Sequence, residues 1–462
     1  MAAYRTVDFW APALYANTIE EVAVPEPGPS RDPIVRHLPI KYGEFESVGV
    51  IKRMAAVNGG LLVADDQYRI SALSLPSPDD ETAVPLVTSQ TAIPVPKAGS
   101  QWTGLAALGE GAISSLASGR VSLFSSGADV SGTLKVGRPV LTLSTPSGPG
   151  VGGSNTFALA GKEVEISVWD ATRAFSATPS STSATAAAAN KRKKDDLAPG
   201  EVWRAKNVAH NSLQIRQPVH HLCSSFLPNS TTDIVTGTKA GNVRRYDTRQ
   251  RKPVGDWKAA REGGVGAVIP GANEHELFFA DHSSLTAAMD LRTGRMLYAV
   301  PGVAASAAFM LALPTPSPAF SRTAGLATIS SDATLRVCAT TPPALHPSKG
   351  NASVTPGKKG SVVGAVGGVG VGSFVFRGFG SHRDVVPPKP EGEDAEEEDY
   401  DEDAEVGEEE EEEIWGGMGE AEAGDSEDED DDDDEEDDDE DEEMDSESES
   451  EDEAPKKKKG RK

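Results

Sequence analysis

Hydrophobic and polar residues alternate in short runs along most of the chain, and tight turns separate these runs. The clearest example is residues 202–254, where residues 218–227, 233–236 and 241–246 each have the length and residue types of a β-strand. Glycine and asparagine lie between the runs, where an antiparallel chain can reverse its direction. The pattern therefore predicts an antiparallel meander in this part of the chain.

The same strand–turn–strand unit recurs before and after this meander. Trp169-Asp170, Tyr246-Asp247 and Met289-Asp290 end corresponding strands, and the last two dipeptides are 43 residues apart. This spacing lies within the period of roughly 40–45 residues that is typical of WD40 propeller blades. The longer gap before Tyr246 contains residues 174–200, which have no strand pattern and are predicted to form a flexible inserted loop.

Repeats of this kind predict a closed ring, because a four-stranded blade buries both of its faces only between neighbouring blades. Candidate units lie at about residues 45–75, 103–125, 139–203, 219–257, 265–300, 303–341 and 360–380. We therefore predict an all-β, WD40-type β-propeller over residues 1–385, with seven blades or, alternatively, six. Residues 4–24 are expected to supply the outer strand of the last blade, and residues 76–98 to form an exposed connection.

Charge divides the chain into two parts. The net charge is −29, but residues 391–454 contain 43 acidic and no basic side chains, whereas residues 1–390 carry a net charge of +8. A segment so rich in like charges cannot bury enough apolar surface to fold. We predict that residues 386–462 are a disordered acidic tail ending in a lysine-rich segment. A cationic body with an anionic tail suits work among nucleic acids and basic proteins, although the tail could also serve only solubility.

Two basic clusters are candidates for recognition by a nuclear import receptor, and four serines are candidates for an acidophilic kinase. The import candidates are Lys191, Arg192, Lys193, Lys194, Lys456, Lys457, Lys458, Lys459, Arg461 and Lys462. The phosphorylation candidates, each with an acidic residue three positions later, are Ser426, Ser446, Ser448 and Ser450. A solvated linker is the alternative interpretation of the first basic cluster.

The residues with potential for chemistry do not form a recognisable catalytic or metal-binding motif. Asp281 precedes His282, but no nucleophile elbow or phosphate-binding loop accompanies them. We predict that Asp281 and Asp332 stabilise turns by accepting backbone hydrogen bonds. The run from His220 to Cys223 is interpreted as alternating strand residues, because no second ligand pair has zinc spacing. We expect no enzyme, cofactor, metal or membrane span, and a soluble intracellular protein.

The region after Trp203 resembles the WD repeat-containing protein 74 family. The matching residues are 203–208 (WRAKNV), Leu213, Arg216, Pro218, Val219, Phe226, Leu227, 235–238 (VTGT), Val243, Arg244, Tyr246, Asp247 and 251–253 (RKP). The resemblance covers roughly residues 103–341, and the acidic run before Ile414-Trp415 with its lysine-rich end is similar too. Residues 335–339 (LRVCA) depart from the family pattern, which ends this unit in Trp-Asp or Tyr-Asp.

The resemblance implies a nucleolar scaffold for assembly of the large ribosomal subunit. Members of the family bind pre-60S particles, support processing of the precursor rRNA and are released by an AAA-type ATPase. Two other functions remain open: an acidic-tailed chaperone of histones or ribosomal proteins, and a propeller enzyme with its site in the central channel. The candidate contacts with a partner or RNA are Arg244, Arg245, Arg249, Arg251, Lys252, Lys206 and Asn207. The first five form a dense cationic run, for which a solvated surface is the alternative, and Arg244 and Arg245 are expected on opposite faces of their strand. For Lys206 and Asn207 the alternative to a partner contact is a structural turn.

Overall fold

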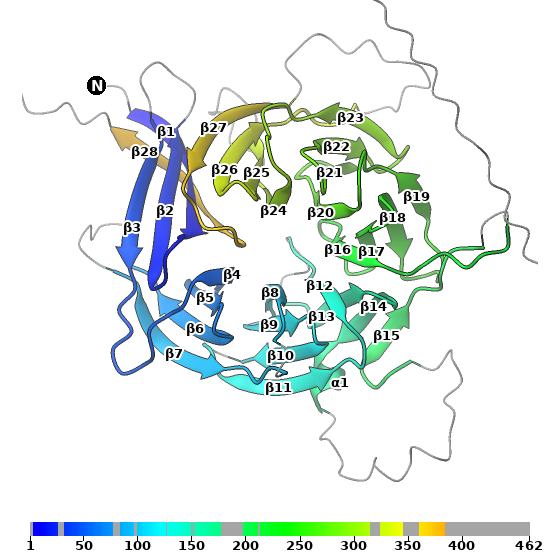
Figure 1. Cartoon of the computed structure of the whole chain (residues 1–462), viewed down its shortest axis with the longest axis horizontal. Coiled ribbons are helices and arrows are strands. Elements are labelled where there is room, and N and C mark those ends of the chain that lie inside the picture. Colours follow the sequence, from blue (N-terminus) through cyan, green and yellow to red (C-terminus); the bar gives the residue numbers. More distant parts are fainter. Residues whose placement is uncertain are drawn as a thin grey trace, which may run out of the picture. The chain divides into compact units, whose positions relative to one another are not determined.

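Seven four-stranded antiparallel sheets are arranged in a ring in the computed structural model (Figure 1). The structure describes residues 3–25, 32–76, 84–96, 99–125, 127–148, 151, 153–176, 197–210, 213–314, 324–344 and 360–383. These residues belong to a compact unit spanning residues 1–387. The predicted β-propeller with seven blades is therefore confirmed. The predicted acidic tail, the nuclear-import candidates and the phosphorylation candidates lie outside the described residues.

The blades are numbered here in chain order. Blade 1 contains β28 (Val375–Arg383), β1 (Ala3–Pro12), β2 (Thr18–Pro25) and β3 (Ile34–Pro39). Blade 2 contains β4 (Ile51–Val57), β5 (Gly60–Asp65), β6 (Arg69–Ser74) and β7 (Leu86–Ala92). Blade 3 contains β8 (Trp102–Leu108), β9 (Gly111–Leu116), β10 (Arg120–Phe124) and β11 (Val130–Lys135).

The remaining four blades follow without exchange of strands, except that β15 comes after the insertion. Blade 4 contains β12 (Val140–Ser144), β13 (Thr156–Gly161), β14 (Val164–Asp170) and β15 (Glu201–Arg204). Blade 5 contains β16 (His221–Phe226), β17 (Asp233–Thr238), β18 (Asn242–Asp247) and β19 (Gly255–Lys258). Blade 6 contains β20 (Val265–Pro270), β21 (Glu276–Asp281), β22 (Thr286–Asp290) and β23 (Arg295–Ala299), and blade 7 contains β24 (Ala307–Ala312), β25 (Ala324–Ser330), β26 (Thr334–Ala339) and β27 (Ser361–Gly367).

Burial follows the position of a strand within its blade. Every residue of β21 and of β25 is buried, because these second strands pack between two neighbouring blades. The outer strands β11 and β19 have no buried residue. The sequence shows the same difference, since β21 reads ELFFAD and β19 reads GDWK. Continuous apolar runs thus mark the middle of each blade, and polar outer strands leave only a weak sequence signal.

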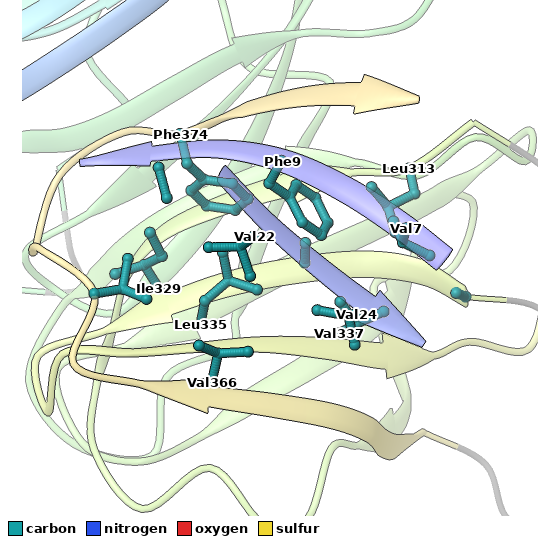
Figure 2. Packing of buried hydrophobic residues seen from close by; sticks show 14 residues of the cluster. Val7, Phe9, Val22, Val24, Leu313, Ile329, Leu335, Val337, Val366 and Phe374 are labelled. Atoms are coloured by element: carbon teal, nitrogen blue, oxygen red, sulfur yellow. The ribbon is translucent and has the colours of Figure 1, made fainter. Parts of the chain in front are cut away.

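The ring closes in blade 1, where the C-terminal strand β28 pairs with β1 over Ala3–Trp10. Phe9 of β1 packs edge-on against Phe374 and Phe376, with ring centroids 5.7 and 6.1 Å apart. Figure 2 shows Phe9 and Phe374 beside Val22, Leu335 and other apolar side chains of blades 1 and 7, which share one buried cluster. Closure thus joins the two ends of the propeller through a continuous core.

Two glycines let the chain cross into this closing position. A Cβ atom on Gly370 would lie 2.4 Å from the carbonyl oxygen of Ala13, and one on Gly372 would lie 2.9 Å from that of Lys52. Both distances are too short for a side chain, so the backbone must come this close without one. The next residue, Ser373, then bonds Met54 through its hydroxyl, which accepts from the Met54 N–H at 2.7 Å.

Closure differs from the sequence prediction in two respects. Residues 4–24 do not add an outer strand to the last blade, because β1, β2 and β3 form three strands of blade 1. The candidate unit at residues 360–380 is not a blade either, because β27 completes blade 7 and β28 completes blade 1. The other six candidate units correspond to blades 2 to 7. The prediction failed where a blade takes strands from both ends of the chain, which removes the local repeat.

Two connecting segments also differ from what the sequence suggested. Residues 76–98 were predicted to be an exposed connection, but β7 lies within them as the outer strand of blade 2. The first residues of the insertion belong to helix α1 (Ala171–Ser176), which covers β11 by packing Phe175 close to Gly132. Residues 177–196 of the insertion lie outside the described residues. Within the described ranges, no helix has the length and apolar composition needed to cross a membrane.

Candidate partner-binding cleft

A cleft with a volume of about 970 Å³ lies between parts of blades 3, 4 and 5. Its walls come from the end of β11 and the turn after it, from β14 and β15, and from the connection between β15 and β16. Arg251, in the turn before β19, completes the lining. Three of the predicted contact residues, Lys206, Asn207 and Arg251, therefore meet in this cleft.

Backbone hydrogen bonds fix the start of the β15–β16 connection. The Ala205 N–H donates to the Ile166 carbonyl at 2.9 Å, and the Lys206 N–H donates to the Arg251 carbonyl at 2.7 Å. In return, Nε of Arg251 donates to the Arg204 carbonyl at 3.1 Å. These reciprocal bonds join blade 4 to the turn of blade 5. The side chain of Lys206 is exposed beside them.

Asn207 holds the two ends of the connection together. Its side-chain amide donates to the Gln217 carbonyl at 2.7 Å, and its side-chain oxygen accepts from the Val208 N–H at 2.8 Å. The side-chain nitrogen and the side-chain oxygen of Asn207 thus both form hydrogen bonds within the loop. Of the two roles considered for Asn207, a partner contact or a structural turn, the geometry supports the structural turn.

The cleft is cationic. Among the described residues that line it, six basic side chains face three carboxylates. The basic residues are Lys135, Arg138, Arg204, Lys206, Arg216 and Arg251, and the acidic ones are Glu163, Glu165 and Glu201. An excess of positive charge in a concave surface concentrates field lines and attracts anionic partners.

Two of the three carboxylates are already engaged by arginines. The buried Glu201 binds Arg204 through two N–H groups, one of them Nε at 2.6 Å, and also accepts from the Ala198 N–H at 2.8 Å. Glu163 is half exposed and lies 3.5 Å from a terminal nitrogen of Arg216. Arg138 donates to the main-chain carbonyl of Glu163 at 2.7 Å rather than to an acid. Lys135, Arg138 and Lys206 thus supply positive charge that no ion pair within the described residues neutralises.

The third carboxylate, Glu165, lies next to His221, which belongs to a buried cluster of polar and aromatic side chains. Its Oε2 is 3.6 Å from Nε2 of His221, whose Nδ1 is 3.2 Å from the Thr236 hydroxyl. Tyr246 packs edge-on against both His221 and Trp203, with ring centroids 6.3 and 6.1 Å apart. Burial raises the pKa of Tyr246. These rings support the wall of the cleft from inside the propeller.

The other predicted contact residues lie elsewhere. Arg244 is buried, with Nε 3.1 Å from Asp256, and Arg249 is exposed but folded onto Asp247. Arg245 binds Asp233 at 3.1 Å and lines a separate pocket of about 440 Å³. Lys252 is exposed next to Arg251 but does not line the cleft. The dense cationic run in the sequence is therefore not a single patch in space.

Sequence reasoning missed four basic residues of the cleft. Arg204 and Arg216 belong to the region that carries the family resemblance, so their positions offered a signal. Lys135 and Arg138 come from blade 3 and reach the cleft only through the ring geometry. No local pattern connects them with Lys206.

Two other chemical candidates have structural roles. The Asp281 carboxylate accepts N–H bonds from Arg261, Glu262 and Ser283 at 3.0, 3.3 and 2.8 Å, which confirms its predicted turn role. Asp332 also accepts a backbone hydrogen bond, from Thr334, as predicted, and it binds the guanidinium of Arg336 at 3.1 Å and at 2.6 Å.

The His220–Cys223 run lies at the start of blade 5. Burial raises the pKa of the Cys223 thiol to about 12, so the thiol is protonated at neutral pH. In the part of the chain that the structure describes, no group of three or more His, Cys, Asp or Glu side chains could hold a metal ion.

The fold defines the chain as a WD-repeat β-propeller. The dipeptides that predicted the repeat, Trp169-Asp170, Tyr246-Asp247 and Met289-Asp290, end the third strands β14, β18 and β22. No protein-family model matches the chain.

Proposed function

We propose that the protein is a non-enzymatic assembly factor of the large ribosomal subunit, which acts in nucleolar pre-60S particles and supports precursor rRNA processing. The observation that carries the proposal is the cationic cleft, because its β15–β16 wall is built from the residues that resemble the WD repeat-containing protein 74 family. Arg204, Lys206, Asn207, Arg216 and Arg251 all belong to or adjoin that region. A rigid ring with a charged cleft fits a binding role, which requires surface rather than reactive groups.

The proposal includes a location and partners. The protein would work in the nucleus and nucleolus, contact pre-60S proteins or the precursor rRNA, and be released by an AAA-type ATPase. The cleft would bind phosphate groups or an acidic protein segment, since arginine suits the geometry of both.

The experiment that tests this function is affinity purification of the tagged full-length protein at moderate salt, followed by identification of the bound proteins and RNA. Co-recovery of large-subunit precursor rRNA with several ribosomal assembly proteins is the expected result. Recovery of other complexes without precursor rRNA would contradict it.

A chaperone of histones or ribosomal proteins is the second candidate, and the 43 acidic residues of positions 391–454 favour it. Such a chaperone would bind free basic proteins through its tail. The same purification separates the two functions, because a chaperone would recover a free basic protein without precursor RNA, and a variant ending at Pro387 would lose that protein.

A further inference from the structure

Four aliphatic side chains are exposed on the segments that form the β15 side of the cleft. Val202 lies in β15 and is 51% exposed, whereas Leu213 and Ile215 lie in the β15–β16 connection and are 73% and 58% exposed. Val254 follows the cleft residue Arg251 and is 52% exposed. Each lies within three residues along the chain of a basic side chain that lines the cleft, whereas none of the four belongs to the lining itself. We call these four residues the apolar rim.

We propose that the cationic cleft and the apolar rim together bind an acidic polypeptide segment that carries aliphatic side chains and belongs to a partner protein. This inference deepens the proposed function and rests on it, because that function leaves both phosphate and carboxylate as the bound anion. Two features favour a polypeptide over RNA.

The first feature is the kind of apolar surface beside the charge. Proteins that bind single-stranded RNA stack the bases on exposed aromatic or arginine planes. Among the described residues that line the cleft, Trp169 is the one aromatic residue, and it is 6% exposed, with its indole N–H bonded to the Ser167 hydroxyl at 2.9 Å. Exposed aliphatic side chains instead gain free energy by burying leucine- or isoleucine-like groups of a peptide.

The second feature is that two arginines of the cleft, Arg204 and Arg216, already bind carboxylates of the same chain. Arg204 already holds the Glu201 carboxylate through two N–H groups, which is the planar geometry that guanidinium and carboxylate share. Arg216 holds Glu163 more loosely, at 3.5 Å, and both side chains are well exposed. An incoming carboxylate can replace Glu163 at Arg216 and reach Lys206 without breaking a buried ion pair.

The acidic residues of the cleft do not oppose this ligand strongly. Glu201 is neutralised by Arg204, and Glu165 faces His221 inside the wall, so Glu163 is the one exposed carboxylate in the described part of the lining. The remaining positive charge of Lys135, Arg138 and Lys206 complements a segment with several acidic side chains.

The test is fluorescence anisotropy with the full-length protein and three labelled probes of similar length. The probes are a glutamate-rich peptide with two leucines, the same peptide with serines in place of the leucines, and an oligouridine RNA. The leucine peptide is expected to bind about tenfold more tightly than the serine peptide. Its affinity should fall with increasing salt, because exposed charges are screened.

Two pairs of substitutions separate charge from apolar contact. Lys206→Glu with Arg216→Glu should weaken both peptides by about tenfold or more, whereas Leu213→Ser with Ile215→Ser should weaken only the leucine peptide. Arg295→Glu is the matched control, since Arg295 is exposed on β23 and does not line the cleft. It should leave every affinity unchanged.

Two results would overturn the inference. One is tighter binding of the RNA than of the leucine peptide, lost in the charge variant and kept in the rim variant. The other is equal binding of the leucine and serine peptides, or binding of neither. The proposed function is tested separately, because recovery of precursor rRNA with the wild-type protein does not depend on which anion occupies the cleft.

Discussion

Asp247 and Asp290 each end the third strand of a blade and hold an arginine two residues later. Arg249 donates to Asp247 through its backbone N–H at 2.9 Å and through its guanidinium, and Arg292 binds Asp290 in the same way. The hydrogen bond from Arg249 is the main cause of the lowered pKa of Asp247. Because the arrangement recurs in two blades, Arg249 stabilises a turn of the repeat. A basic residue next to a repeat signature therefore does not by itself indicate a binding site.

The first residue-scale prediction concerns Asp281, which is 1% exposed. Burial alone would raise the pKa of Asp281, but hydrogen bonds from Ser283, Glu262 and Arg261 outweigh it and lower the pKa. Asp281→Ala should lower the free energy of unfolding by about 2–3 kcal/mol, because three partly buried N–H groups lose their acceptor. Denaturant unfolding at neutral pH measures this loss.

The pH dependence gives the control for this prediction. A carboxylate whose pKa is lowered by folding stabilises the folded state at pH values above the pKa of the unfolded chain, about 3.9. This stabilisation is lost as the pH falls through the pKa of the folded state. The difference between wild type and Asp281→Ala should thus be constant above about pH 4 and shrink below it. Asp129→Ala, at an exposed position just before β11, should change stability by less than about 0.5 kcal/mol. A similar loss for both variants would contradict the assigned role.

The second residue-scale prediction concerns Glu20 in β2, whose pKa burial raises from 4.5 to about 7. A raised pKa means that the folded state binds a proton more tightly than the unfolded state, so stability falls as the pH rises from about 4.5 to 7. Glu20→Gln, which cannot ionise, should therefore stabilise the protein by about 1–3 kcal/mol at pH 8 and have no stabilising effect at pH 4.5.

Melting temperatures at the two pH values test this prediction. Glu21→Gln is the matched control, because Glu21 binds Arg36 at 3.1 Å and also contacts Arg377. It should show no gain at pH 8. A Glu20→Gln protein that melts below wild type at pH 8 would show that the carboxylate is stabilising.

At the scale of elements, the sequence predicts strands well where the repeat is local. The meander at residues 218–246 becomes β16, β17 and β18, and Tyr246 and Val235 are buried in blade packing as expected. The prediction fails for blade 1, because β28 pairs with β1 across almost the whole chain. It also fails for β7, whose centre is a run of four polar residues without alternation and which follows an acidic, proline-containing stretch. Strand pairing between distant segments leaves no local pattern.

The closing strand supplies the prediction at this scale. A variant ending at Gly372 lacks Phe374 and Phe376 and leaves the β1 edge unpaired, so it should lose cooperative unfolding or melt far below wild type. A variant ending at Pro387 keeps β28 and is the control. It should melt within a few degrees of the full-length protein, because the compact unit ends there. Equal melting of the two shortened proteins would show that β28 does not close the ring.

At the scale of the whole molecule, the propeller brings together residues that the sequence keeps apart. Lys135 and Arg138, at the end of blade 3 and just after it, line the same cleft as Lys206 and Arg216. Arg244 and Arg245 are adjacent in the chain but bind different carboxylates, Asp256 and Asp233. The pocket that contains Arg245 has an excess of acidic side chains, because Asp233, Glu274 and Glu276 also line it. The fold class was therefore predictable from periodicity, whereas the site was predictable only in the segment that resembles a known family.

Particle association of a cleft variant tests the central claim most directly. Lys206→Glu with Arg216→Glu should keep the wild-type melting temperature, because both side chains are exposed, yet no longer co-sediment with pre-60S particles. Tyr246→Ala, at a fully buried position, should lower the melting temperature strongly and costs about 3–5 kcal/mol. If the cleft variant melts normally and still travels with the particles at raised salt, the cleft is not the site through which the protein joins them.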